Sequence, residues 1–210
     1  MRATDILRPT PAGLCCPEGD FYIDPVRPVD RAIITHGHSD HARAGHGRVL
    51  ATAETLAIME ERYGADFAGD TQALAYGETI RQGGVNVRLA PAGHVLGSAQ
   101  ILVEREGCRI VVSGDYKLEA DSTCLPFEPI RCHTFVTEST FGHPFFAWDD
   151  QQITFQQIHD WWRDNQERGL ASWLYAYPLG KAQRLLAVAV IPFRFADLDG
   201  QIEVNAGREL

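Results

Sequence analysis

The sequence predicts an α/β protein with a strand-rich first part and a helix-rich part after about residue 148. Three observations support this fold class. Several short runs in the first part alternate apolar and polar residues or are rich in β-branched residues. A long amphipathic run follows residue 148, and after it a strand-like run precedes a second helical one. Strands that give way to alternating strand and helix are typical of layered α/β folds.

The first part contains a series of strand-like runs, of which residues 83–94 are the clearest. There Val85, Val87 and Leu89 alternate with polar residues, which is the period of a half-buried strand. Residues 49–64 read as a strand that leads into a helix ending at Gly64. The remaining strand-like runs are residues 20–25, 31–36 and 132–140, and a hairpin is predicted over residues 99–117.

The part after residue 148 predicts a helix, a strand and a second helix. In residues 149–169, Asp149 or Asp150 is a suitable N-cap, apolar residues fall on one face and Gly169 is a stop signal. Residues 171–178 read as a strand and residues 180–190 as a helix. We therefore expect a first domain over residues 1–147 and the start of a Rossmann-like domain over residues 148–190. Residues 191–210 follow no clear pattern.

Composition is typical of a soluble globular protein, with 45% hydrophobic and 22% charged residues among 210. The sequence has no apolar run of membrane-spanning or signal-peptide length, which favours a cytoplasmic protein without a membrane partner. Five cysteines without a CxxC pair predict neither a disulfide framework nor a cysteine zinc site. The net charge of −9 argues against a nucleic-acid partner, because proteins that bind phosphates usually have a basic surface. The argument is weak, since bound divalent cations would offset part of the negative charge.

Residues 32–46, "AIITHGHSDHARAGH", concentrate four of the eight histidines directly after an apolar run. In an extended segment His36, His38 and Asp40 share one face, because side chains two apart point the same way. If a helix begins near Asp40, His41 turns in a second direction. Imidazole and carboxylate groups suit zinc, manganese or iron. The motif therefore predicts a metal site, with two histidines for one ion and an Asp/His pair for a neighbouring ion.

Further ligands are expected from the ends of other strands. His94 lies between glycines in "APAGHVLGSAQ", and Asp115 ends the apolar run "VVSGD", where its carboxylate could bridge two metal ions. Two divalent ions can activate a shared water molecule and stabilise the charge on a phosphodiester or an ester. Such a site hydrolyses its substrate without a serine or cysteine nucleophile.

These motifs resemble the metallo-β-lactamase superfamily of hydrolases. The resemblance rests on "THGHSDH", Asp24 upstream, His94 in "AGHVLGSA" and Asp115 in "SGDYK", and it extends from residue 20 to about residue 145. Within that superfamily, "VTESTFGHP" and "YPLGKAQRLL" resemble the β-CASP nucleases. The opening residues through "THGHSDHA" are most similar to bacterial exonucleases associated with DNA ligase.

The resemblance implies an αβ/βα sandwich with two divalent metal ions at one edge, Zn²⁺ as the first candidate and Mn²⁺ as the alternative. It implies that His36, His38 and His94 bind the first ion, that Asp40 and His41 bind the second, and that Asp115 bridges them. Asp24 would orient the histidine loop. Glu138 matches an acidic family motif beside the site, so Asp40, Asp115 and Glu138 are the candidate catalytic residues.

Other polar residues are weaker candidates. His143 in "FGHP" follows Glu138 closely enough in sequence to approach the site, and Lys117, Lys181 and Arg184 could contact nucleic-acid phosphates. Solvated surface charge is the competing interpretation for these three cations. His46 is interpreted as a loop residue outside the site.

The chain departs from the family pattern near its end. β-CASP enzymes carry two later histidine motifs, whereas no histidine follows His159 here, so the second metal site is expected to lack a ligand. A truncated or frame-shifted gene product is the favoured explanation. The alternatives are a fragment completed by another chain and a short form that holds one metal well.

The leading hypothesis is a metal-dependent 5′-to-3′ DNA exonuclease in DNA repair, with a functional link to a DNA ligase. One alternative is an RNA-processing β-CASP nuclease that uses the same residues. A second is a thioester or lactone hydrolase of glyoxalase II type, which shares HxHxDH but is disfavoured by "VTEST" and "YPLGKAQ". A third is an inactive remnant that only binds metal or nucleic acid.

Overall fold

The computed structural model describes residues 2–190, which form two units. The first unit ends at Glu138 and the second begins at Ser139. Each unit is described by itself below. The expected boundary near residue 148 stays a prediction, and the expected tail, residues 191–210, lies outside the described residues.

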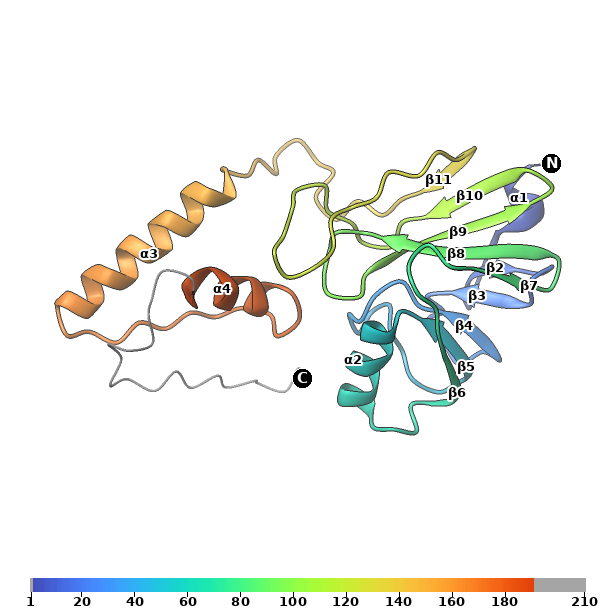
Figure 1. The fold of residues 1–210 in the computed structure, drawn as a ribbon, viewed down its shortest axis with the longest axis horizontal. Helices are drawn as coiled ribbons and strands as arrows, with labels where there is room; N and C mark the ends of the chain where they lie inside the picture. The colour runs from blue at the N-terminus through green and yellow to red at the C-terminus, as the bar shows by residue number, and fades with distance from the viewer. Residues whose placement is uncertain (1, 191–210) are drawn as a thin grey trace. The chain divides into compact units, whose positions relative to one another are not determined.

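The first unit contains two β-sheets, which confirms the predicted mixed α/β fold (Figure 1). The first sheet has the strand order β1-β2-β3-β4-β5-β6. Its first three strands pair antiparallel, and β3 to β6 run parallel. The strands are β1 Arg8–Thr10, β2 Gly13–Cys16, β3 Phe21–Ile23, β4 Arg31–Ile33, β5 His46–Ala51 and β6 Ala68–Ala73; a short helix, α1 Ala3–Ile6, precedes them.

The second sheet has the order β11-β10-β9-β8-β7 and is antiparallel except for the parallel pair β10 and β11. The predicted hairpin is confirmed, since β9 and β10 pair across the turn at Glu106 and Gly107. The strands are β7 Thr79–Gln82, β8 Val85–Pro91, β9 Ala99–Arg105, β10 Cys108–Val112 and β11 Thr134–Val136.

The main core lies between the two sheets. The first sheet contributes Phe21 and Leu50, and the second contributes Val87, Ile101 and Ile110; all five are buried. The alternation of Val85, Val87 and Leu89 in the sequence is therefore explained, because all three side chains belong to this core. Removal of this apolar surface from water is the main source of stability for the sandwich.

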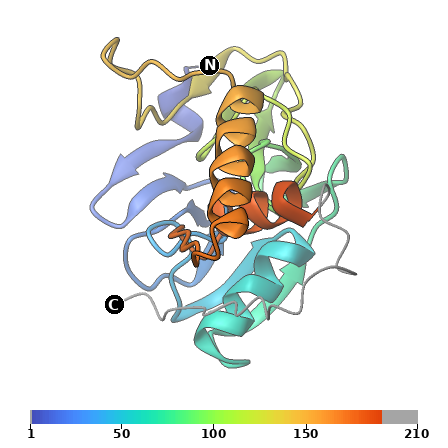
Figure 2. The same cartoon turned by 90° about the vertical axis from the view of Figure 1, so that its left-hand side faces the viewer.

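Helix α2, Ala53–Tyr63, lies against the other face of the first sheet (Figure 2). A second apolar cluster is buried between this helix and the sheet. Met59 of the helix is fully buried in this cluster beside Val49. Thr52 caps the helix through its hydroxyl oxygen, which accepts a hydrogen bond from the Thr55 N–H, and Gly64 ends it at φ 90°. Helix α2 thus covers one outer face of the sandwich.

In the second unit, Asp150 caps α3, Gln151–Glu167, as the sequence predicts, and α4 spans Lys181–Val190. Residues 171–178 are not a strand, contrary to expectation. A strand requires a neighbour for its backbone hydrogen bonds, and no strand is present elsewhere in residues 139–190. Within the described part of the chain, no helix is both long and apolar enough to span a membrane.

Candidate metal centre

The histidine loop begins where β4 ends, at the edge of the first sheet. Three residues past the end of β4 lies His36, which is fully buried. The chain then turns sharply, because the N–H groups of His41 and Ala42 both donate to the His38 carbonyl, at 3.1 and 2.7 Å. No helix begins near Asp40; this tight turn gives His41 the different direction that the sequence suggested.

The second sheet delivers His94 and Asp115 from the ends of β8 and β10. The turn that carries His94 is held by Ser98, whose hydroxyl oxygen accepts hydrogen bonds from the N–H groups of His94 and Val95 at 3.1 and 3.2 Å. Across the sandwich, the Ala99 N–H donates to the Thr35 carbonyl at 2.7 Å. The two sheets are therefore joined at the edge where the four side chains meet.

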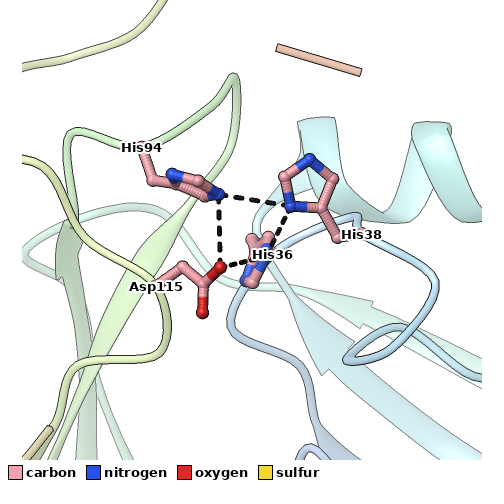
Figure 3. Close-up of side chains that lie close together, drawn as sticks. All are labelled: His36, His38, His94 and Asp115. Atoms are coloured by element: carbon pink, nitrogen blue, oxygen red, sulfur yellow. Dashed lines mark hydrogen bonds and ion pairs between the residues drawn. The ribbon is translucent and has the colours of Figure 1, made fainter. Parts of the chain in front are cut away.

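The side chains of His36, His38, His94 and Asp115 converge at this edge (Figure 3). His38 Nδ1 lies 3.0 Å from His36 Nε2 and 3.2 Å from His94 Nε2. Asp115 Oδ2 lies 3.9 Å from His36 Nε2 and 3.5 Å from His94 Nε2. One ligand atom from each of the four residues lies within 4.8 Å of the other three.

His41 lies on the other oxygen of the same carboxylate. Its Nε2 is 3.3 Å from Asp115 Oδ1 and 3.7 Å from Asp40 Oδ2. The Asp40 side chain is 74% exposed and therefore borders solvent. Asp115 thus faces the three-histidine group with one oxygen and His41 with the other, an arrangement that suits a carboxylate shared by two cations.

Asp24 links His36 and His41 through hydrogen bonds on the side of their Nδ1 atoms. Its Oδ2 accepts hydrogen bonds from the Thr35 hydroxyl at 2.6 Å and from His41 Nδ1 at 2.8 Å, and its Oδ1 accepts the Thr35 N–H at 2.8 Å. Because the hydroxyl proton of Thr35 goes to Asp24, the oxygen is left to accept from His36 Nδ1, 3.1 Å away. Both His36 and His41 therefore carry a proton on Nδ1 and direct Nε2 toward the cluster.

The electrostatics of the centre suit a bound cation. Burial holds the pKa of His36 well below its usual value, and burial also lowers the pKa of His94. Burial acts the same way on His41, but its hydrogen bonds to Asp115 and Asp24 outweigh it and raise the pKa of His41 to about 10. The hydrogen bond with His41 is also the main reason that the pKa of Asp115 falls to about 2. The centre therefore combines the neutral imidazoles of His36 and His94 with the ionised carboxylate of Asp115, which is the state that metal ligands require. His41 is held protonated by its two carboxylate partners and would release a proton on binding a metal ion.

The donor set fits divalent metal ions. Three imidazole nitrogens and one carboxylate oxygen lie within 4.8 Å of one another. Neutral imidazoles cannot all act as donors to one another at such a meeting point, whereas a cation satisfies every lone pair. Imidazole with carboxylate is the ligand set of zinc and related transition metals.

The other candidates in the first unit lie around this centre. The charge of Glu138 favours the protonated form of His94, so the carboxylate lies within electrostatic range of that ring. Lys117 Nζ lies 3.7 Å from Asp121 Oδ2 and 3.9 Å from Glu119 Oε2. Its charge is therefore already matched by two carboxylates, which weakens its candidacy as a phosphate contact.

The interpretation of His46 as a loop residue is wrong. His46 is the first residue of β5 and is only 1% exposed, and its Nδ1 accepts a hydrogen bond from the Val29 N–H at 3.3 Å. His46 is not one of the four residues that converge in the cluster, and its place outside the site stays a prediction.

Three further candidates belong to the second unit. His143 stacks on the ring of Phe145 with 4.4 Å between centroids. Lys181 Nζ lies 5.0 Å from the centroid of the Tyr177 ring, and the Arg184 guanidinium lies 5.3 Å from that of Phe155. The contacts of Lys181 and Arg184 are cation–π pairs within the unit. The proposed substrate-binding role of these residues stays a prediction.

Thr35 is a functional residue that the sequence reasoning missed. It precedes His36 directly, so its hydroxyl group in "THGHSDH" was the available signal. Its role depends on Asp24, which adopts a left-handed backbone conformation at φ 43° and comes from a different strand end. The spacing of the motif alone contains no information on that contact.

Comparison with known proteins identifies the family. The family model described as "Metallo-beta-lactamase superfamily" matches residues 13–165. A probable DNA ligase from Opitutus terrae is 31% identical over 176 residues, which cover 83% of this chain and 17% of that protein. The endoribonuclease YSH1 from Mycosarcoma maydis is 30% identical, covering 75% of this chain and 22% of its own length. A cleavage and polyadenylation specificity factor subunit 3-I from Arabidopsis thaliana is 29% identical, covering 80% and 29%.

These relatives agree with the β-CASP branch that the motifs suggested. The chain spans less than a third of the length of each of the three.

Proposed function

Since the chain belongs to the metallo-beta-lactamase superfamily, we propose that it is a metal-dependent phosphodiesterase that degrades DNA from its ends, in the 5′-to-3′ direction. The observation that carries this proposal is the convergence of His36, His38, His94 and Asp115, with His41 on the second oxygen of Asp115. The chemistry needs no protein nucleophile, because divalent metal ions activate water and polarise a phosphodiester. Zn²⁺ is the first candidate for the metal and Mn²⁺ the second.

Each residue of the centre has a defined task in this proposal. His36, His38 and His94 would hold one ion, Asp40 and His41 would hold the second, and Asp115 would be shared between them. Asp24 fixes the protonated nitrogen of His41 directly and that of His36 through Thr35. Glu138 is the proposed proton donor to the departing oxygen, and its charge acts on His94, which supports a position near the centre.

The relatives support nucleic acid as the substrate class. One is named a probable DNA ligase, which supports action at DNA ends and a functional link to ligation in repair. Two others, an endoribonuclease and a polyadenylation factor subunit, support RNA as the alternative substrate. The proposed centre would serve either, because metal-activated water attacks the phosphodiester, a group that DNA and RNA share.

The test measures metal content and cleavage with the same preparation. Metal per chain is determined first, and then 5′- and 3′-labelled single- and double-stranded DNA are compared with RNA of the same sequence. We expect bound metal and stepwise loss of nucleotides from the 5′ end of DNA. His94→Ala and Asp40→Ala should abolish cleavage, whereas His133→Ala, on a histidine whose ring contacts the Arg109 backbone, should not.

Three outcomes would contradict the proposal. A preparation without bound metal would remove its chemical basis. Hydrolysis of a thioester without cleavage of nucleic acid would favour the glyoxalase II alternative. Cleavage that survives both His94→Ala and Asp40→Ala would originate from another site or another protein.

A further inference from the structure

The N-terminal end of helix α2 binds the turn that carries His94. The hydroxyl groups of Thr52 and Thr55 both donate to the Gly97 carbonyl, at 2.7 and 3.0 Å. Both threonines are buried, at 2% and 0% exposure. Gly97 has φ +77°, and a Cβ there would lie 2.8 Å from the Thr55 nitrogen, so the contact is close. The N-terminal end of the helix is therefore hydrogen-bonded to the turn through the Gly97 carbonyl oxygen.

The C-terminal end of the same helix binds the histidine loop. The guanidinium of Arg62 donates to the Gly37 carbonyl, between His36 and His38, and the Tyr63 hydroxyl donates to the Ala42 carbonyl at 2.9 Å. Ile58 packs against Gly37 so closely that a Cβ on Gly37 would lie 2.7 Å from it. Both ends of the loop that carries four candidate ligands are thus held by one helix.

All four donors bind backbone carbonyls, and all of those carbonyls lie within three residues of a candidate ligand. An α-helix is stiff, and 11 residues rise about 16 Å, so its two ends keep a fixed separation. The two loops approach the centre from different sheets, and α2 contacts both. The packing of its Met59 in the buried cluster anchors the helix to the first sheet.

We propose that α2 is a clamp that positions the two ligand-bearing loops relative to each other, and that Thr52, Thr55, Arg62 and Tyr63 are the positioning residues that set metal affinity. The proposal rests on the metal site of the proposed function but not on its substrate. Partners that orient metal ligands typically change affinity about 10- to 100-fold when they are removed.

The test uses two variants that each remove a hydroxyl group and little else, Tyr63→Phe and Thr55→Val. The first keeps an aromatic ring beside Arg62, and the second keeps the backbone N–H that completes the Thr52 cap. The matched controls are Tyr175→Phe, at a side chain that is 90% exposed, and Thr71→Val, on the exposed strand β6. The wild type and all four variants are the full chain.

Three measurements are made on each protein. The Kd for Zn²⁺ is obtained by competition with a chromogenic chelator, the visible spectrum is recorded with Co²⁺ bound, and urea unfolding is followed without metal. We expect Tyr63→Phe and Thr55→Val each to raise the Kd about tenfold or more and to alter the Co²⁺ spectrum. Tyr175→Phe and Thr71→Val should leave both unchanged.

The outcomes separate this proposal from the proposed function. If both variants lose stability without metal but keep the wild-type Kd and Co²⁺ spectrum, α2 supports only the fold and the proposal is wrong. If the wild type binds Zn²⁺, the variants bind it more weakly and no nuclease activity exists, the clamp stands and the proposed function fails. If the wild type binds no metal, both are overturned.

Discussion

At the scale of single residues, Asp24 is hydrogen-bonded to His41 directly and to His36 through Thr35. It accepts three hydrogen bonds, from the Thr35 N–H, the Thr35 hydroxyl and His41 Nδ1. Its φ of 43° is also one that few residues tolerate, although asparagine does so readily. A change from aspartate to asparagine therefore tests the hydrogen bonds without disturbing the backbone.

We predict that Asp24→Asn weakens Zn²⁺ binding about 10- to 100-fold. The amide NH₂ of the introduced asparagine would face a donor, so either His41 or Thr35 must turn away. The Kd from chelator competition measures the effect. Asp20→Asn is the matched control, because Asp20 has a similar φ of 52° but pairs with Arg31 at the surface. Equal Kd values for the two variants would show that Asp24 does not orient the ligands.

The second prediction at the scale of single residues concerns His46 and the pH dependence of folding stability. Burial lowers the pKa of His46, and its Nδ1 accepts the Val29 N–H, so the folded state keeps the ring neutral. The unfolded chain takes up a proton near the usual pKa of about 6.5. The stability that depends on the neutral ring is therefore fully present above that pKa and is lost as the pH falls below it.

We expect His46→Gln to reduce the loss of unfolding free energy between about pH 7.5 and about pH 5.5, on either side of the usual histidine pKa. Urea unfolding in the presence of a chelator, which keeps metal binding out of the comparison, measures this at each pH. At about pH 8 and above, the difference in unfolding free energy between the wild type and His46→Gln should become independent of pH. A variant that loses as much stability as the wild type on acidification would show that His46 is not the group responsible.

At the scale of elements, Gln100 of β9 connects the two segments that carry His94 and Asp115. Its side-chain amide donates to the carbonyls of Pro91, at the end of β8, and Glu128, in the segment after Asp115, both at 2.8 Å. Its side chain is fully buried. The segment that follows Asp115 is thereby held against the second sheet.

We predict that Gln100→Met lowers the free energy of unfolding by about 1–3 kcal/mol, because the Glu128 carbonyl loses its donor inside the protein. Gln72→Met on the exposed edge strand β6 is the control and should change it by less than about 0.5 kcal/mol. Urea unfolding compares the two. A loss for Gln100→Met as small as that of the control would mean that solvent reaches the Glu128 carbonyl.

The elements also show what the sequence could and could not predict. Alternation located β8, and the apolar run closed by Gly64 located α2, because both patterns are local. The strands β1, β2, β6 and β7 were not predicted: β6, "AGDTQA", has an almost fully exposed side-chain pattern and is a strand through its pairing with β5. His36, His38, His94 and Asp115 also lie in local motifs after strands, so the sequence could single them out as candidates. Thr35, Gln100 and the donors of α2 act through contacts that no local pattern encodes.

At the scale of the whole molecule, the two units differ in how their apolar residues are packed. Among the described residues, the buried core residues all precede residue 139, whereas α3 in the second unit has no buried residue. The four residues of the metal cluster also belong to the first unit. The buried core and the candidate metal ligands therefore both lie within residues 1–138, while many aromatic side chains of the second unit are exposed.

We predict that a chain of residues 1–138 folds cooperatively and binds Zn²⁺ with a Kd within about threefold of the full chain, well inside the 10-fold effect of removing a ligand partner. The physical reason is that its core, helix α2 and every residue of the cluster lie within those residues. A single urea transition and chelator competition are the measurements, and saturating metal at about 100 times the Kd should stabilise both chains by about 2.7 kcal/mol. His94→Ala in the shortened chain is the control and should remove that stabilisation. A shortened chain that folds but binds metal about tenfold more weakly would show that the second unit contributes to the centre.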